Sequence, residues 1–229
     1  MDIGKETDRV ELVQLDVTDQ NSLSAAAEHV KASYGRVDEL FNVAGILGDG
    51  KITPGPERSL KQVDKDWAMR TMDVNALGPV MVTQAFQDLL RSKGKEGRPN
   101  SIVASLSARV GSISDNRMGG WISYRMSKAA LNQATKCMGL ELKRLGIHVI
   151  AYHPGTTRTD LSAPFAANVK PEKLFSTEFT VSRLLDICDG VVRTTALGPF
   201  TVCCKPINCS SLPFFRPMSI LAASMTLMA

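Results

Sequence analysis

The sequence of 229 residues lacks a long hydrophobic run, and this absence argues against a membrane protein. The polar start MDIGKETDRV (1–10) contains no apolar core of the kind found in secretory signals. The apolar stretch MSILAASMTLMA (218–229) has 12 residues, whereas a helix needs ~20 to span a bilayer. We therefore expect no membrane partner, and a cytoplasmic location is the default expectation.

Paired cysteines are also missing. The chain has five cysteines, Cys137, Cys188, Cys203, Cys204 and Cys209, and they show neither Cys-x-x-Cys spacing nor the Cys/His spacing of metal sites. Nothing in this pattern indicates an oxidising compartment, so we expect free thiols and no metal site.

Strong charge bias is absent too. The 27 basic and 23 acidic residues give a net charge of +4, and the basic residues are scattered along the chain. Scattered charge indicates solvated faces, so no nucleic-acid partner is expected. An apolar content of 44% and a charged content of 22% are typical of a globular protein, and the length suits one domain with a substantial core.

Strand-like and helix-like segments alternate along the chain. Apolar, β-rich runs occur at 9–17, 37–45, 101–106 and 147–152, and helical patterns at 21–35, 64–94 and 121–146. Gly35 and Gly146 are placed to end two of these helices, and Pro79 predicts a bend near 75–79. The alternation predicts an α/β fold with a doubly wound parallel sheet, in which ligands bind outside the carboxyl ends of the strands.

Tyr124 and Lys128 form a candidate catalytic pair within YRMSKAAL (124–131). Residues four apart lie on one face of a helix, and a lysine beside a phenol favours the phenolate. This predicts a Tyr124 pKa below the usual value of about 10. Taken alone, the spacing is also common on ordinary helix surfaces. Asn75 adds to the pattern. Asparagine is a poor helix former, so its position inside a long predicted helix indicates a specific role.

Five motifs, in one order over roughly residues 9–190, resemble the short-chain dehydrogenase/reductase family. They are LDVTD (15–19), NVAG (42–45), DVNALGP (73–79), LSARVGSISDNRMGGWISYRMSKAALNQ (106–133) and HPGTTRTDLSAPF (153–165). Within this family the chain more closely resembles the C-factor and sniffer-like carbonyl reductases, including their plant members. The resemblance implies a Rossmann-like sheet and hydride transfer between NADP or NAD and a carbonyl or secondary alcohol.

The resemblance also implies roles for single residues. Tyr124 would be the general acid/base, Lys128 would bind the nicotinamide ribose, and Asn75 would hold a water of a proton relay. Tyr124 and Lys128 also count among the implied cofactor contacts. The others are Asp16 and Val17 at adenine, Asn42, Ala44 and Gly45 along the adenosine and ribose, and Pro154, Gly155, Thr157 and Thr159 at the nicotinamide and pyrophosphate.

The serine loop departs from the family pattern Ser-Ser-x-x-Gly. Counted back from Gly111, the catalytic slot holds Ala108, whose methyl group cannot donate a hydrogen bond. Losing one such donor costs about 10²–10³ in rate. Ser107 is the candidate replacement if the loop is offset by one residue, and an ordinary serine at a strand end is equally open.

The family's opening strand and Thr-Gly-x-x-x-Gly-x-Gly turn have no counterpart in this chain. That turn presents N–H groups to the pyrophosphate. We therefore expect a fold that lacks the first β-α-β unit, with the strand at 9–16 displaced or paired with 37–43 across the gap. Losing two charge-assisted bonds of ~1.5 kcal/mol each predicts coenzyme binding at least ~100-fold weaker than in a full-length relative.

The C-terminal region also departs from the family pattern, because the resemblance fades after residue 190. GPFTVCC (198–204) is expected to form the last strand of an incomplete NAD(P)-binding Rossmann domain at 1–204, followed by an atypical apolar tail at 205–229.

Three hypotheses stay open. They are an active oxidoreductase, a cofactor-deficient and non-catalytic member acting as an interaction subunit, and an incomplete gene model. The implied partners are a small carbonyl or alcohol substrate and a second copy bound through helices 64–93 and 121–145.

Overall fold

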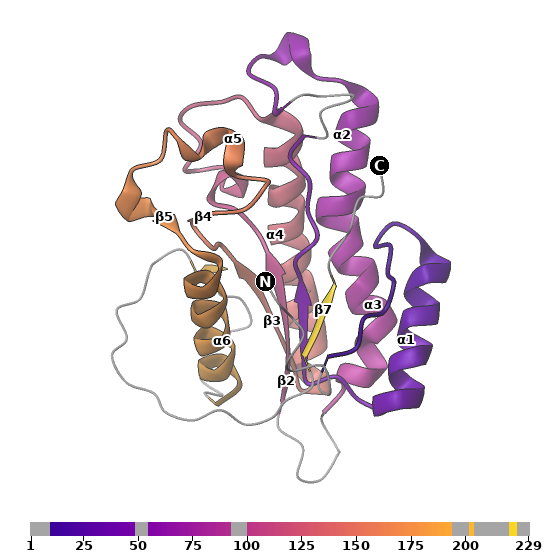
Figure 1. Cartoon of the computed structure of the whole chain (residues 1–229). Helices are drawn as coiled ribbons and strands as arrows, with labels where there is room; N and C mark the ends of the chain where they lie inside the picture. The colour runs from indigo at the N-terminus through magenta and orange to yellow at the C-terminus, as the bar shows by residue number, and fades with distance from the viewer. Residues whose placement is uncertain (1–9, 49–54, 93–99, 194–201, 204–219, 224–229) are drawn as a thin grey trace.

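The computed structural model describes residues 10–48, 55–92, 100–193, 202–203 and 220–223. A parallel sheet runs through the middle of the molecule (Figure 1). Its strands are β1 (Glu39–Asn42), β2 (Ser101–Leu106), β3 (Ile147–Tyr152), β6 (Val202–Cys203) and β7 (Ile220–Ala223). The long helices are α1 (Gln20–Tyr34), α2 (Lys65–Met72), α3 (Gly78–Leu90), α4 (Ile122–Leu142) and α6 (Thr177–Arg193).

Short elements connect these parts. β4 (Thr156–Thr157) and β5 (Leu174–Phe175) pair with each other, and α5 (Ala163–Ala166) lies between them in the chain. A π-helical turn, Asp73–Leu77, joins α2 to α3. Single 3₁₀ turns occur at Leu60–Gln62, Arg109–Gly111, Lys143–Leu145 and Pro171–Lys173.

The five-stranded sheet has the order β6-β3-β2-β1-β7, and every neighbouring pair is parallel. The parallel pairing predicted for 37–43, 101–106 and 147–152 is therefore confirmed. The register places Asn42 opposite Ser105, and Leu106 opposite Tyr152. The carboxyl ends of these strands thus meet at one edge, where the sequence predicts the ligand site.

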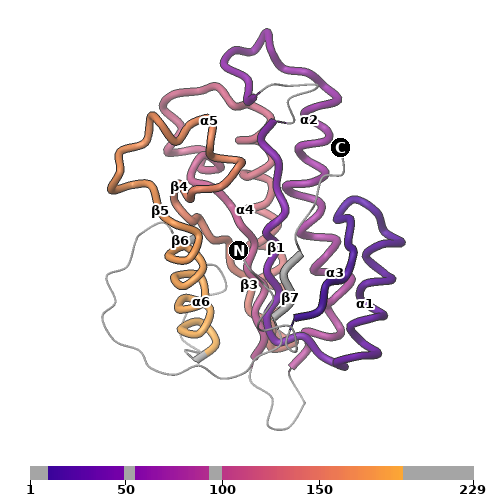
Figure 2. The backbone as a smooth tube through the Cα atoms, in the orientation of Figure 1, coloured from indigo at the N-terminus to yellow at the C-terminus, as the bar shows by residue number. Residues whose placement is uncertain are grey.

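Both faces of the sheet are covered by helices, as predicted, with α6 on one side and α1 and α3 on the other (Figure 2). Leu40 and Val103 belong to the core that includes α1 to α4, whereas their neighbours Phe41 and Ile102 belong to the core with α6. Because both faces of the sheet are covered, β1 and β2 are buried at consecutive residues rather than at every second one.

The strand predicted at 9–17 is wrong for the part that the structure describes, because residues 10–16 form no regular element. The edge of β1 pairs with β7 instead, in the register Glu39↔Ile220 to Asn42↔Ala223. Among the described residues, 10–16 therefore has no strand to pair with. Val10 and Leu12 are exposed there, Leu12 at 89%.

The predicted helices are confirmed, with one interruption. Gly35 ends α1 in the left-handed conformation, and Asp19 accepts a bond from Asn21 N at its start. The long helix predicted at 64–94 is broken at 73–77, where Gly78 N bonds Asp73 O five residues back. Such a widened turn is frequent at functional sites, and it contains Asn75.

The C-terminal predictions fall partly outside the described residues. Of the strand predicted at 198–204, the structure describes Val202–Cys203, which pairs with β3. The division into 1–204 and 205–229 stays a prediction, although part of the tail, Ile220–Ala223, pairs within the sheet. In the described ranges, no helix has the length and apolar character to cross a membrane, and no His/Cys/Asp/Glu group could hold a metal ion.

Candidate active site

Tyr124 and Lys128 lie on one face of α4, beside the carboxyl end of β2. Lys128 is only 4% exposed, and its Nζ donates a 2.8 Å hydrogen bond to the carbonyl oxygen of Leu106. The same Nζ lies 5.6 Å from the centroid of the Tyr124 ring. The ammonium group has three donors, so this single bond leaves capacity for a further partner.

Burial sets the protonation of this pair. It raises the pKa of Tyr124 to about 12 and lowers the pKa of Lys128 to about 8. The predicted lowering of the Tyr124 pKa is therefore wrong for this structure. The reason is that desolvation favours the neutral form of both groups. A lysine with a pKa of about 8 also offers less positive charge to its neighbour than an exposed one.

Asn75 ties the loop after β1 to α4. Its side chain is fully buried; Oδ1 accepts from Ile46 N at 2.8 Å, and Nδ2 donates to Ile46 O at 2.8 Å and to Ser127 Oγ at 3.1 Å. The amide thus holds residue 46 from both sides and reaches the residue before Lys128. The relay water implied for Asn75 stays a prediction.

Gly45 brings the backbone against this group. A Cβ atom at Gly45 would lie 3.4 Å from Asn75 Oδ1 and 3.7 Å from Lys128 Nζ. A side chain here would therefore fill the space beside the ammonium group. Because the half-buried Ala44 and Gly45 are small, a ligand can approach the backbone and the unused Lys128 donors together. This chemistry fits the hydroxyl groups of a nucleotide ribose.

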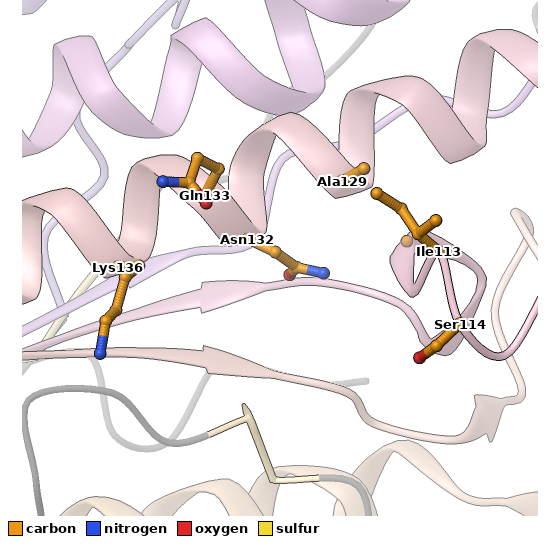
Figure 3. A pocket seen from close by; sticks show the side chains of 7 residues that line it. Ile113, Ser114, Ala129, Asn132, Gln133 and Lys136 are labelled. Carbon is orange, nitrogen blue, oxygen red and sulfur yellow. The ribbon is translucent and has the colours of Figure 1, made fainter.

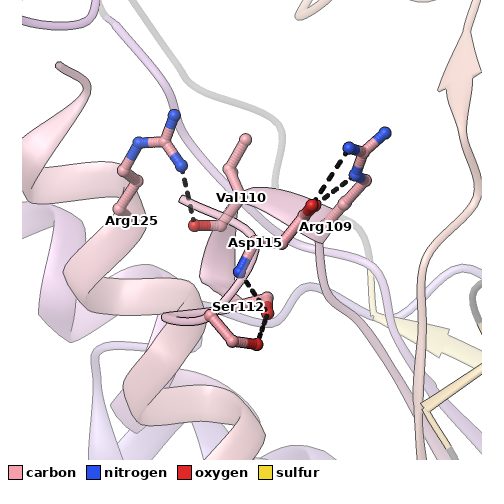
Figure 4. A network of polar contacts seen from close by, with 6 residues as sticks. Arg109, Val110, Ser112, Asp115 and Arg125 are labelled. Atoms are coloured by element: carbon pink, nitrogen blue, oxygen red, sulfur yellow. Dashed lines mark hydrogen bonds and ion pairs between the residues drawn. The ribbon is translucent and has the colours of Figure 1, made fainter. Parts of the chain in front are cut away.

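The loop after β2 packs directly on α4. A Cβ at Gly111 would lie 2.8–2.9 Å from the Lys128 backbone and Cβ, so this close approach needs glycine. Figure 4 shows Arg125 donating to Val110 O and Arg109 paired with Asp115. These contacts hold the loop that carries Ala108 and Ser107.

Ser107 meets α4 at a different place from Tyr124. It is 6% exposed, and its Oγ donates to Asn132 Oδ1 at 2.6 Å. Asn132 follows Tyr124 by eight residues, or ~12 Å along the helix. Sequence reasoning missed Asn132, although its spacing of four from Lys128 placed it on the same face.

A shallow groove of about 520 Å³ lies beyond Asn132, between the loop and the outer side of α4 (Figure 3). Its lining is Gly111, Ile113, Ser114, Ala129, Asn132, Gln133 and Lys136. Neither Tyr124 nor Lys128 lines it, so the groove is separate from the catalytic pair.

The predicted contacts at 154–159 form a strap over the sheet edge. Gly155 has a left-handed φ of 73°, and a Cβ there would lie 2.6 Å from the Phe175 ring. Thr157 Oγ1 lies 2.9 Å from Thr180 Oγ1, which ties the strap to α6. Pro154 is half-buried, and Thr159 is exposed and accepts from Ser162 through its backbone oxygen.

Asp16 lies just before α1. Its Oδ1 accepts from the backbone N and the hydroxyl of Thr18, both at 2.8 Å, and these bonds lower the pKa of the carboxyl. The exposed carboxylate is therefore charged and available to a ligand. Val17, in contrast, is buried in the core against Gly78, so its side chain is not available.

Asn42 also directs its side chain into the fold. Its amide nitrogen lies 3.1 Å from Ser105 Oγ and 3.4 Å from Thr83 Oγ1, which joins β1 to β2 and α3. The structure thus brings Tyr124, Lys128, Asn75 and Gly45 together. Within the described residues, Asp16 and the strap make no direct bond to Tyr124 or Lys128.

Trp121 borders the catalytic pair and was not singled out from the sequence. Its ring centroid lies 6.3 Å from that of Tyr124 and 5.1 Å from that of Phe165 in α5. An aromatic wall therefore separates Tyr124 from the segment after β4. Its φ of 53° is the only positive value among the described non-glycine residues.

Comparison with known proteins assigns the family. A family model described as short chain dehydrogenase matches residues 1–170. The chain is 37% identical over 157 residues to the C-signal of Myxococcus xanthus, covering 69% of this chain and 83% of that protein. It is 35% identical over 151 residues to 1-hydroxy-2-glutathionyl-2-methyl-3-butene dehydrogenase of Rhodococcus sp. (strain AD45). That match covers 66% of this chain and 60% of the dehydrogenase.

Among solved structures, the fold is similar to the NADPH-bound carbonyl reductase from chicken fatty liver. The TM-score is 0.71 at 25% identity, with 83% of this chain and 73% of the reductase covered. The chain belongs to the short-chain dehydrogenase family, a group of NAD(P)-dependent oxidoreductases. The resemblance seen in the sequence, including C-factor and carbonyl reductase relatives, is confirmed.

Proposed function

We propose that this chain reduces a small carbonyl compound, with hydride from NADPH or NADH and a proton from Tyr124. The observation that carries the proposal is the convergence of Tyr124, Lys128, Asn75 and Gly45 at the carboxyl edge of the sheet. The bound coenzyme would supply the hydride. NADPH is the first choice, since the similar chicken carbonyl reductase is described with NADPH.

The side chains of the protein would bind and orient the coenzyme and the substrate. The remaining Lys128 donors would bind ribose hydroxyl groups beside Gly45, and Asp16 would accept a bond from adenine. With a pKa of about 12, Tyr124 is protonated at neutral pH and can donate to a carbonyl oxygen. In this protonation state Tyr124 can give the proton that carbonyl reduction requires, whereas alcohol oxidation would use the phenolate as base.

A second donor to the carbonyl oxygen is proposed at Ser107. Ser107, predicted from the sequence, would have to exchange its bond to Asn132 for one to the substrate. Asn75 would fix the position of residue 46 relative to Lys128 and would hold the relay water. The remaining contacts proposed for the coenzyme are Val17, Asn42 and Ala44, which can offer backbone atoms, and Pro154, Gly155, Thr157 and Thr159.

A homodimer is the proposed assembly. Apolar side chains are exposed along the two helices predicted to pair, namely Met69 and Leu77 on one and Met126 and Leu140 on the other. The same exposed side chains support the alternative of a non-catalytic interaction subunit. The cytoplasmic location stays a prediction.

The test is NADPH oxidation followed by absorbance with a panel of aliphatic and aromatic aldehydes and ketones. Tyr124→Phe removes the proton donor and leaves the ring, so turnover should fall by about 10²–10⁴ while NADPH affinity stays within about threefold. Wild-type protein that neither binds NADPH nor turns over any compound in the panel would favour the cofactor-deficient interaction subunit. Equal turnover by wild type and Tyr124→Phe would refute the assigned role.

A further inference from the structure

Glu57 is a buried acid that the proposed reaction does not use. It is 3% exposed and lies in the loop before the 3₁₀ turn Leu60–Gln62. Its Oε1 accepts hydrogen bonds from both the backbone N (3.3 Å) and the hydroxyl of Ser123. Its backbone oxygen accepts from Trp121 N. One residue of a distant loop therefore holds the first turn of α4 at two points.

The start of α4 needs an acceptor from elsewhere. The first N–H groups of a helix have no partner inside it, and a side chain at the preceding residue normally supplies one. Here that residue is Trp121, which makes no side-chain cap and adopts φ 53°. Gly119 and Gly120 before it also have positive φ values, 66° and 64°. A carboxylate from the loop fills the missing role, and its charge suits a helix N-terminus.

The second carboxylate oxygen of Glu57 shows that this capping arrangement carries a free-energy cost. Glu57 Oε2 is buried and has no hydrogen-bond partner among the residues that the structure describes. An unpaired buried polar atom costs free energy and calls for an explanation. At φ 53° residue 121 lies outside the extended conformation from which a side chain normally caps a helix, so the acceptor has to come from another segment. The arrangement therefore keeps Trp121 at the helix start and fixes the helix from outside.

We propose that Glu57 is a positioning residue for Tyr124. Ser123, which Glu57 holds by two bonds, directly precedes Tyr124 in the first turn of α4. Trp121, held through its N–H, places its ring against those of Tyr124 and Phe165. Glu57 thereby sets the height of the phenol above the sheet edge and the angle of its aromatic wall. The inference rests on the proposed function for its catalytic consequence.

The first test reads the position of Tyr124 without any substrate. The chain has three tyrosines, so incorporated fluorotyrosine gives few NMR resonances, and loss of one in Tyr124→Phe identifies Tyr124. Glu57→Ala should shift and broaden this resonance. Glu57→Gln keeps an acceptor for Ser123 and should restore the wild-type resonance. Ser123→Ala removes only the hydroxyl bond and should give a smaller shift in the same direction.

The matched control is Asp64→Ala. Asp64 caps α2 through a 2.8 Å bond from Trp67 N, so its loss removes a carboxylate cap of the same kind from another helix. Asp64→Ala should lower the free energy of unfolding, because it removes a helix cap, and should leave the Tyr124 resonance in place. An unshifted Tyr124 resonance in Glu57→Ala would overturn the proposal, as would equal shifts in both variants.

The second test measures the reaction. A misplacement of about 1 Å at a reacting group can lower the rate about 100-fold, so Glu57→Ala should lower kcat about 10- to 100-fold. NADPH affinity should stay within about threefold, and Glu57→Gln should recover most of kcat. A kcat equal to wild type in Glu57→Ala would overturn the proposal. An inactive wild-type protein would refute the proposed function instead, and the NMR test would still decide whether Glu57 positions Tyr124.

Discussion

Replacing Lys128 with methionine should abolish activity and should change the free energy of unfolding by an amount that depends on pH. Burial lowers the pKa of Lys128 from its ordinary 10.5 to about 8. Each pKa unit corresponds to 1.36 kcal/mol, so holding the charged lysine in the fold costs about 3 kcal/mol. Methionine has a similar length without the charge, and the 4% exposure of Lys128 leaves little room for water to offset the cost.

The sign follows from proton binding. Between about pH 8 and 10.5 the unfolded chain still binds the proton that the folded chain has lost, so wild-type stability rises with pH in this window. Lys128→Met lacks this titration. Its stability relative to wild type should therefore be greatest below about pH 8 and should decline by about 3 kcal/mol as pH passes 10.5. Loss of the bond to Leu106 O costs about 1–3 kcal/mol at every pH, so the net gain near neutral pH is about 0–2 kcal/mol.

The assay is urea unfolding of both proteins at several pH values between about 7 and 11. Lys31→Met is the control, because an exposed lysine on α1 should change stability by no more than about 0.5 kcal/mol at any of these values. Parallel stability profiles for wild type and Lys128→Met would refute the argument from burial. Lys128→Met should also lose carbonyl reduction, since it removes the proposed ribose ligand.

Two further changes test the loops around the site. Ser107→Ala removes the hydroxyl that is proposed as the second donor and should lower the reduction rate about 10²- to 10³-fold. A small change in Ser107→Ala together with a higher rate in Ala108→Ser, both measured by steady-state kinetics, would instead place the donor at the family's catalytic slot. Gly155→Ala adds a Cβ 2.6 Å from the Phe175 ring at a left-handed φ and should cost about 2–4 kcal/mol of stability, so an unchanged urea midpoint would show that the strap adapts freely.

Several parts of this protein were predictable because they depend on residues close together in the chain. The parallel strands at 39–42, 101–106 and 147–152 are short apolar runs between helical segments, and their pairing follows from that order. Gly35 ends its helix as expected, and the break at 73–77 lies next to Pro79. The spacing of four placed Tyr124 and Lys128 on one helix face, since the period of a helix is a local property.

Other features depended on partners far away in the sequence. The strand predicted at 9–17 had a suitable pattern, but a strand also needs a neighbour, and the edge of β1 pairs with Ile220–Ala223. Neither segment's own sequence determines which of the two pairs with β1. Likewise, the sequence gives no partner for the Ser107 hydroxyl, and only the fold places Asn132 beside it.

The sequence by itself determined the family, the order of strands and helices, and the identity of the Tyr124–Lys128 pair, because motifs and periodicity are carried by neighbouring residues. Only the tertiary structure decided the protonation of that pair and the way its helix begins. A pKa depends on how much water surrounds a group, and burial here outweighs the attraction that the spacing suggested. The cap from Glu57 spans 66 positions to Ser123, a contact that no local pattern encodes and that folding alone creates.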